Sequence, residues 1–185
     1  MKAGFQVIVQ FCFAGIMSLL SVLQILGKNV TVIADDSKVS LTQSIIGKAF
    51  ASGVIAENVR VITYEKQRSA EEQLFDESGC PLYDVILASE RVGRASDGNY
   101  YSCKGMKLSE RVSPIDDLFL LAQKHAEVVT IGIGDGGNEM GMGKAFENVQ
   151  KHIFKGKLVA CATPADLLIA TGKWLSRRDF IVIVW

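Results

Sequence analysis

The sequence has little proline, only two histidines and no excess of charge of either sign. Its 20 basic side chains balance its 20 acidic ones, so nothing in the composition indicates a nucleic-acid partner. His125 and His152 are too few for a histidine-rich metal site. The four cysteines are scattered and form no C-x-x-C pair, which favours reduced thiols over a disulfide framework or a zinc site.

Charge is also absent between Lys2 and Lys28, a span long enough to cross a bilayer. A signal peptide is an alternative, although no convincing small-residue cleavage site follows. Against both, several polar side chains fall on one narrow face when the run is plotted as a helix, among them Gln6, Gln10 and Gln24. We therefore expect a buried helix that leads into a sheet, with a membrane or signal segment over residues 5–27 as the less favoured alternative.

Apolar, strand-like runs alternate with helical patterns along the rest of the chain. The expected strands are residues 30–34, 59–63, 83–88, 128–133 and 158–162, and a last apolar run covers 180–185. The expected helices are residues 41–51, 69–76, 114–124 and 144–154, with a short one opened by Thr163-Pro164. This order predicts an α/β fold: a doubly wound, mostly parallel sheet of about five or six strands with helices on both faces, in a Rossmann-like three-layer arrangement. We expect one domain over residues 1–185.

The segment from Thr130 to Gly143 is the most informative, because a β-branched run ends there in six glycines that enclose Asp135, Asn138 and Glu139. Glycine at this density destabilises regular structure, so it indicates a backbone with unusual angles or a close approach to another group. We expect a strand-to-helix loop that binds a polar small molecule or a cation.

Two other interpretations of this loop are weaker. Gly132-x-Gly134-x-x-Gly137 matches the dinucleotide fingerprint, but no helix follows at once and acidic side chains would face the phosphates. The loop also looks like the magnesium-binding loop of haloacid-dehalogenase-type phosphatases, although Asp35-Asp36 lacks the D-x-D spacing of their nucleophile. The second comparison still makes a hard divalent cation at Asp135 and Glu139 chemically reasonable.

A second segment, Ser89 to Tyr101, combines Glu90 with two arginines three residues apart. Arg91 and Arg94 could hold a carboxylate through paired hydrogen bonds, and Glu90 could act as a general acid or base. The alternative is a solvated loop with local ion pairs, in which Asp97-Gly98 forms a turn.

Parallel sheets bind ligands beyond the carboxyl ends of their strands, and polar residues follow four of the expected strands. We expect these residues to meet at one rim, whereas the simpler interpretation is that loops are polar anyway. They are Asp35, Asp36, Glu90, Arg91, Asp135, Asn138, Glu139, Thr163 and Asp166.

The two segments together resemble the C-terminal domain family of D-glutamate cyclase. The resemblance is carried by E-R-x-G-x-x-x-D-G-x-Y from Glu90 to Tyr100 and by I-G-D-G-G-N-E-x-G-M-G from Ile133 to Gly143, and it covers roughly residues 14–172. It implies conversion of D-glutamate to 5-oxo-D-proline and water by a mitochondrial matrix enzyme. In full-length proteins of the family a larger N-terminal domain precedes this region and is a candidate for the cyclase site. The ends, residues 1–13 and 173–185, depart from the family pattern: the first is apolar, and at the second the run from Gly172 to Arg178 replaces a Ser-Asn-Trp-Gly segment.

On this resemblance we expect a small-molecule site for an amino dicarboxylate, with no nucleic acid and no membrane as partner. The expected catalytic residues are Glu90, Asp135 and Glu139. The expected substrate-binding residues are Arg91, Arg94, Asp97, Gly136, Gly137, Asn138, Thr163 and Asp166, with the glycine amides stabilising the developing oxyanion. No cofactor is firmly implied, and a divalent cation would bind at Asp135 and Glu139. The alternatives are a non-catalytic ligand-binding module of a larger cyclase and a magnesium-dependent phosphatase.

Overall fold

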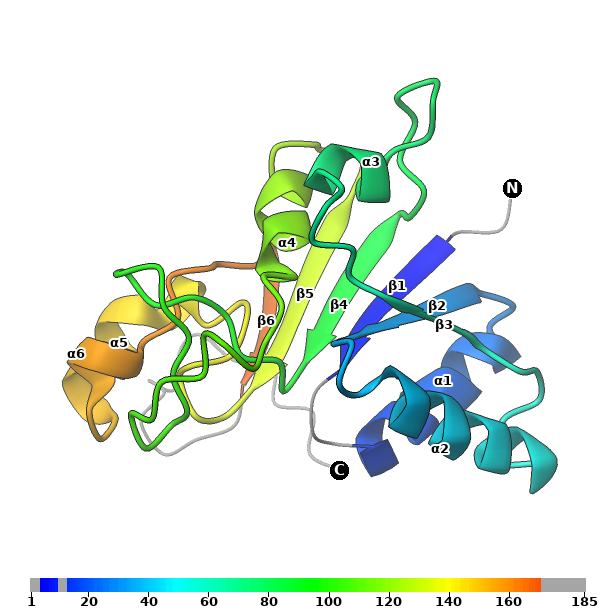
Figure 1. Ribbon diagram of the computed structural model, residues 1–185, viewed down its shortest axis with the longest axis horizontal. Coiled ribbons are helices and arrows are strands. Elements are labelled where there is room, and N and C mark those ends of the chain that lie inside the picture. The colour runs from blue at the N-terminus through cyan, green and yellow to red at the C-terminus, as the bar shows by residue number, and fades with distance from the viewer. Residues whose placement is uncertain (1–3, 10–12, 171–185) are drawn as a thin grey trace.

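A computed structural model describes residues 4–9 and 13–170 (Figure 1). The strands are β1 (Gly4–Val9), β2 (Asn29–Ala34), β3 (Arg60–Thr63), β4 (Val85–Ser89), β5 (Val129–Gly134) and β6 (Leu167–Ala170). The helices are α1 (Phe13–Ile25), α2 (Val39–Ala51), α3 (Ala70–Leu74), α4 (Asp116–Ala122), α5 (Phe146–His152) and α6 (Gly156–Val159), with a 3-10 turn η1 (Gly143–Ala145).

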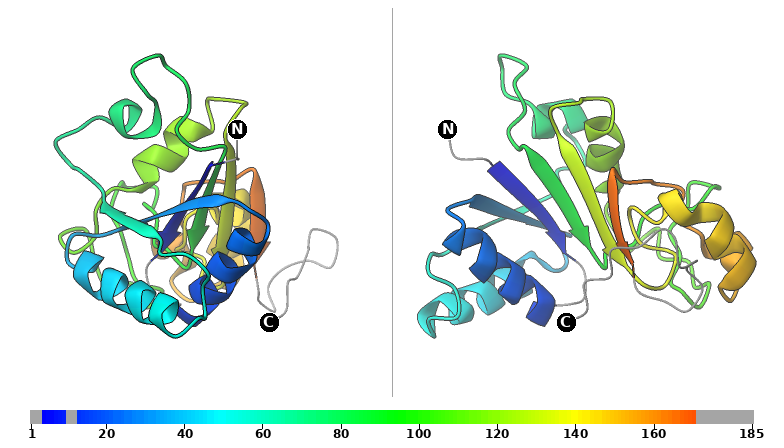
Figure 2. Two further views of the ribbon diagram at one scale, coloured as in Figure 1. Left: turned by 90° about the vertical axis from the view of Figure 1, so that its right-hand side faces the viewer. Right: turned by 180° about the vertical axis from the view of Figure 1, so that it is seen from behind.

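The six described strands form one sheet in the order β3-β2-β1-β4-β5-β6, and all neighbouring pairs are parallel. Because every strand runs the same way, the carboxyl ends of β4 and β5 lie side by side at one edge. The predicted doubly wound α/β fold is therefore confirmed. Helices α1 and α2 lie toward the β2–β3 half of the sheet, and α5 and α6 lie beyond β6 (Figure 2).

Successive strand residues point to opposite faces, and both faces of the sheet are buried. Val7 of β1 packs with Leu20 and Ile46 of α1 and α2 on one face. Ile8, the next residue of β1, packs with Leu118 and Phe119 of α4 on the other. Two apolar layers therefore sandwich the sheet, as expected for parallel strands with near-continuous apolar sequence.

The uncharged N-terminal run forms a central strand and a helix, so the expectation of one continuous helix is wrong. Residues Gly4–Val9 pair with both β2 and β4, and α1 begins only at Phe13. A strand buried on both faces has no polar alternation, and periodicity alone cannot distinguish it from a buried helix. Within the part of the chain described here, no helix is both long enough and apolar enough to cross a membrane.

The order of elements near the C-terminus is also wrong in the sequence-based prediction. Residues 156–159 form α6 where a fifth strand was expected, and Leu167–Ala170 form β6 where a short helix was expected. Ala160 and Cys161 are buried because they pack in one cluster with Val149 of α5, which explains an apolar run outside the sheet. The predicted run at 180–185 lies outside the described residues.

Candidate active site

The two motif segments lie against each other through their backbones. Val92 and Glu139 form an antiparallel bridge, and the Gly93 N–H donates to the Asn138 carbonyl oxygen at 3.0 Å. The Met140 N–H donates to the Arg91 carbonyl oxygen at 2.7 Å. Segments 90–94 and 137–141 therefore lie side by side, as we expected from their positions after neighbouring strands.

Three carboxylates meet where these segments join. Glu90 follows β4, Asp135 follows β5, and Glu139 lies in the loop after Asp135. Each of the three offers a carboxylate oxygen, and these oxygens all lie within 4.8 Å of one another. We call Glu90, Asp135 and Glu139 the acidic cluster. Asp135 is exposed, Glu90 is partly exposed and Glu139 is buried, so the cluster is open to solvent on one side only.

Two glycines make room for the buried carboxylate of Glu139. A Cβ atom at Gly134 would lie 2.7 Å from Glu139 Cβ, and one at Gly136 would lie 2.7 Å from Glu139 Oε1. The Gly136 N–H donates to Oε1 at 2.8 Å, whereas Oε2 is buried without a hydrogen-bond partner among the described residues. The Gly136 amide expected to bind a substrate oxyanion thus holds Glu139 instead.

Glu90 has a strained backbone, with φ of 52°, and its N–H donates to the Ile133 carbonyl oxygen at 2.8 Å. Residues other than glycine rarely adopt this left-handed backbone conformation, and strained residues of this kind are concentrated at functional sites. Burial, together with the nearby charges of Glu139 and Asp135, raises the pKa of Glu90 to about 7. Burial also raises the pKa of Glu139. Negative charge in the cluster is therefore costly without a cation or a proton.

Arg91 does not face this cluster. Its guanidinium is fully buried, where Nη2 donates to Asp35 Oδ1 at 3.0 Å and to the Ser113 carbonyl oxygen at 2.7 Å. Burial lowers the pKa of Arg91, and the charge of Asp35 opposes that effect. The arginine expected to bind substrate instead ties the carboxyl end of β2 to the loop before α4. Asp35, so engaged, is not free to act as the nucleophile that the phosphatase alternative needs.

Arg94 is also engaged by acidic side chains. Its Nε donates to Asp116 Oδ2 at 2.6 Å, and its Nη2 pairs with Asp117. Asp116 also accepts hydrogen bonds from Tyr100 Oη at 2.6 Å and from Thr163 Oγ1 at 3.3 Å. Thr163 therefore belongs to this buried network. Asp116 lies in the helix expected over residues 114–124, but the sequence did not reveal that its side chain is buried.

The remaining predicted site residues have local structural contacts. Asp97 is exposed and accepts from Tyr101 Oη at 2.6 Å, whereas Asn138 Nδ2 donates to the Tyr101 carbonyl oxygen at 2.8 Å. Asp166 precedes β6 and accepts from the Thr130 N–H at 2.7 Å, near the amino end of β5. It therefore lies at the opposite end of the sheet from the acidic cluster.

Gly137 allows this loop to pack closely against α5. Its φ of 90° suits glycine, and an added Cβ would lie 2.5 Å from a methyl carbon of Val149 in α5. Gly132 and Gly134 of the same motif lie inside β5, and the next helical turn, η1, begins only at Gly143. This position does not match the strand-loop-helix geometry that the dinucleotide fingerprint requires.

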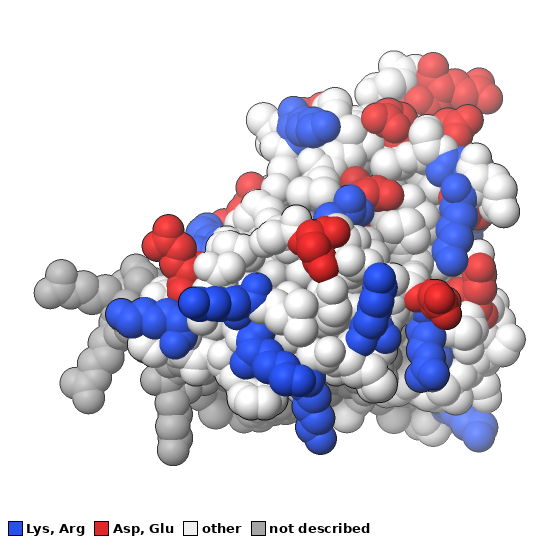
Figure 3. Space-filling view, turned by 60° about the vertical axis from the view of Figure 1, so that its left-hand side comes forward, with Lys and Arg blue, Asp and Glu red and all other residues white. Residues whose placement is uncertain are grey.

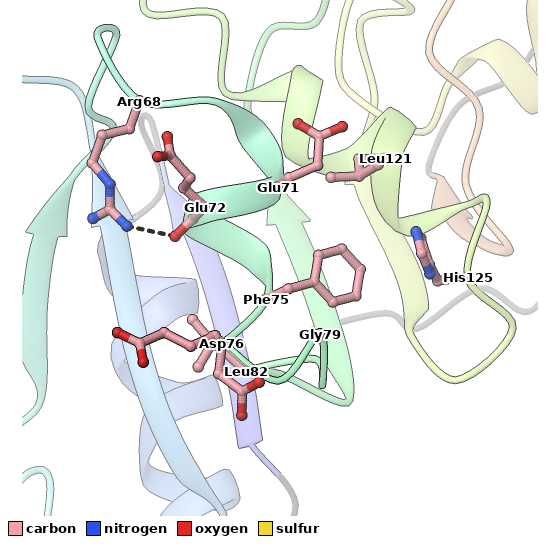
Figure 4. Close-up of a pocket in the computed structure, with 10 residues that line it drawn as sticks. Arg68, Glu71, Glu72, Phe75, Asp76, Gly79, Leu82, Leu121 and His125 are labelled. Carbon is pink, nitrogen blue, oxygen red and sulfur yellow. Dashed lines mark hydrogen bonds between the residues drawn. The ribbon is translucent and has the colours of Figure 1, made fainter.

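A hollow also lies elsewhere, between α3, α4 and the 76–82 loop (Figure 4). It measures about 900 Å³, and Phe75 and His125 pack at its wall with ring centroids 4.5 Å apart. Leu82, another of its lining residues, lies beside Gly4, where β1 starts. The hollow is thus at the amino ends of the strands. We favour the acidic cluster as the site because, among the described residues, it joins convergent carboxylates, backbone strain and an unpartnered buried oxygen at the carboxyl edge.

Exposed basic side chains gather over α5, α6 and the loop before α4 (Figure 3). They include Lys104, Lys107, Lys151, Lys155 and Lys157. In the described part of the chain, no salt bridge joins a basic side chain to the acidic cluster.

Comparisons with known proteins agree with the motif resemblance. Residues 13–172 match the family described as "D-glutamate cyclase-like, C-terminal". The human protein named "D-glutamate cyclase, mitochondrial" is 40% identical over 162 residues, which cover 85% of this chain and 26% of that protein. The chain thus spans about a quarter of the length of this curated relative.

Among solved structures, the lactate dehydrogenase of Eimeria maxima with NADH and oxamate aligns with 93% of this chain and 44% of its own. Its sequence identity is 15% and its TM-score 0.43, a likeness too low to support a conclusion about this chain.

Fold and site define a parallel α/β protein with an acidic site at the carboxyl edge of its sheet. Within that class, the chain belongs to the D-glutamate cyclase-like, C-terminal family.

Proposed function

We propose that this chain contributes a site for the cyclisation of D-glutamate to 5-oxo-D-proline and water. The observation that carries the proposal is the acidic cluster, in which three carboxylates of the two family motifs lie within 4.8 Å at the edge where parallel sheets bind ligands. The name of the human relative supports the substrate. By the same relationship we propose a mitochondrial location, in the matrix.

The reaction joins the amine nitrogen to the γ-carboxyl carbon and breaks a carbon–oxygen bond. The ammonium loses two protons, and the departing oxygen gains two and leaves as water. A proton acceptor and a proton donor must therefore both reach the substrate. Glu90 and Asp135 have this role in our proposal because they form the solvent-facing part of the acidic cluster. Glu139 is buried, so in our proposal it positions the substrate or the other two carboxylates and does not transfer protons.

A specific observation also favours a second candidate, a ligand-binding module without its own chemistry. The chain matches only 26% of the human relative, so the remainder of a longer protein could supply the catalytic groups. In that case the acidic cluster would bind D-glutamate or a regulatory ligand, and no product would form on this chain alone.

One experiment separates the candidates. The purified chain is incubated with D-glutamate and with L-glutamate, 5-oxoproline is measured by chromatography, and binding is measured by calorimetry. Product from D-glutamate that is lost in Asp135→Asn supports the cyclase site, with exposed Glu147→Gln of α5 as the matched control. Binding without product supports the module, and neither binding nor product contradicts both.

A further inference from the structure

The acidic cluster lacks a positive partner. This holds for the described residues, in which none of the salt bridges involves Glu90, Asp135 or Glu139. The nearby Arg91 and Arg94 are paired with Asp35 and with Asp116 and Asp117. Three carboxylates held within 4.8 Å repel one another unless a cation or protons neutralise them.

Glu139 gives a second and independent indication of a ligand. Its side chain is only 6% exposed, and its Oε2 is buried with no hydrogen-bond donor among the residues described. A buried carboxylate oxygen without a partner costs free energy, and native proteins normally satisfy such atoms. The glycines at 134 and 136 leave the space that this carboxylate fills, so its inward position is built into the loop.

We propose that Glu90, Asp135 and Glu139 bind one hard divalent cation, Mg²⁺ or Mn²⁺. All three donors are carboxylate oxygens, which such ions prefer. Metal–oxygen bonds of about 2.0–2.5 Å place ligand oxygens on opposite sides of one ion about 4–5 Å apart. The 4.8 Å limit on the separation of the cluster oxygens fits this range. No histidine or cysteine belongs to the cluster, which disfavours zinc or copper.

The exposed side of Asp135 leaves coordination positions for water or a substrate oxygen. In the proposed cyclase reaction, the cation would attract the carboxylate of an anionic substrate and polarise it. This role alone, and not the cation site itself, rests on the proposed function. Among the described residues, Arg91 and Arg94 already have acidic partners, so the cation supplies positive charge for the substrate carboxylate. An unneutralised acidic cluster would instead repel both carboxylates of glutamate.

The test is direct binding of Mn²⁺ to the full chain after treatment with chelator. Free Mn²⁺ is followed by electron paramagnetic resonance during a titration, without D-glutamate present, and Mg²⁺ is then added as a competitor. We expect saturation at one ion per chain, with displacement by Mg²⁺. Glu139→Gln and Asp135→Asn each weaken binding by about tenfold or more, because each removes an anionic ligand. Circular dichroism verifies that the variants fold.

Glu147→Gln is the matched control, since Glu147 is an exposed acid of α5 outside the acidic cluster, and it leaves the affinity unchanged. No saturable binding at millimolar Mn²⁺ overturns the proposal, as does binding that Glu139→Gln and Asp135→Asn leave unaltered. The failure of the cyclase proposal is distinguishable: a chain that binds Mn²⁺ at these residues but forms no 5-oxoproline retains the cation site and lacks the activity.

Discussion

The guanidinium of Arg91 lies wholly inside the protein, between Asp35 and the carbonyl of Ser113. The Ser113 N–H also donates to Asp35 Oδ1, at 2.7 Å, so the three residues tie two loops of the carboxyl edge together. Arg91 is thus a structural residue of the site, and its removal should act on stability.

We expect Arg91→Met to lower the free energy of unfolding by about 3–5 kcal/mol, because it leaves the buried charge of Asp35 without its partner. Urea denaturation measures this loss. Arg68→Ala is the control: Arg68 forms an exposed pair with Glu65, and such pairs contribute about 1 kcal/mol or less. Equal effects of the two substitutions would contradict the structural role of Arg91.

Asp116 gives the fold a specific acid sensitivity. Burial raises the pKa of Asp116, but hydrogen bonds from Arg94 and Tyr100 outweigh burial, and the net pKa lies below 3.8. A depressed folded-state pKa stabilises the fold above the unfolded-state pKa, and this stability is lost as pH falls through the folded-state value.

We therefore expect the free energy of unfolding to decrease as pH falls below about 4. Asp116→Asn should lower stability at pH 7 by about 1–3 kcal/mol and flatten this acid slope. Urea denaturation at a series of pH values measures both effects. A variant slope as steep as that of the unaltered chain would show that Asp116 does not carry the acid sensitivity.

At the scale of elements, a glycine in β5 allows the loop after this strand to pack closely against it. A Cβ at Gly132 would lie 2.6 Å from the Met140 carbonyl oxygen and 2.8 Å from Gly141 Cα, both backbone atoms that cannot rotate away. The loop that carries Glu139 is thus pressed directly against the strand.

Gly132→Ala should consequently destabilise the fold by about 1–3 kcal/mol, as overpacking does. Gly47→Ala is the matched control, because Gly47 lies within α2 with no atom within 4 Å of a Cβ, and alanine should stabilise that helix by about 1 kcal/mol. Thermal unfolding compares the two. If Gly132→Ala proved as stable as Gly47→Ala, close strand–loop contact would not be the reason for this glycine.

Sequence patterns predicted the sheet and most of its helices, and their failures have physical causes. The run that forms β1 and α1 is uncharged and its few polar residues fit one helical face, so its periodicity did not distinguish the strand from a helix. Ala160 and Cys161 resemble part of a strand because a loop segment that packs against α5 also buries apolar side chains.

The acidic cluster was predictable because Glu90, Asp135 and Glu139 follow adjacent strands. The acidic partners of Arg91 and Arg94 were not predictable, because residue type does not reveal which carboxylate lies within reach in the folded chain. Asp35 and Asp116 are distant in sequence from their arginine partners and meet them only in the folded chain.

Over the whole molecule, the two ends of the sheet differ in character. The carboxyl edge holds the acidic cluster, whereas the amino edge holds the hollow near Phe75 and His125 (Figure 4). Ligands of open parallel sheets bind at the carboxyl edge, so the size of the hollow does not decide the location of the site.

A cation bound to the folded state alone should stabilise the whole molecule. At a Mn²⁺ concentration about 100 times the dissociation constant, the free energy of unfolding should rise by about 2.7 kcal/mol, and the midpoint of thermal unfolding should rise with it. Calorimetry with and without Mn²⁺ measures this shift. Glu139→Gln should largely abolish it, and a shift that persists in this variant would assign the stabilising ion to other residues.

The most direct measurement is a crystal structure of the chain grown with Mn²⁺ and D-glutamate, with anomalous diffraction locating the metal. Our account predicts one strong anomalous peak between the carboxylates of Glu90, Asp135 and Glu139, with ligand density on the exposed side of Asp135. A peak or ligand bound instead in the hollow beside Phe75 and His125, with the acidic cluster vacant, would contradict it.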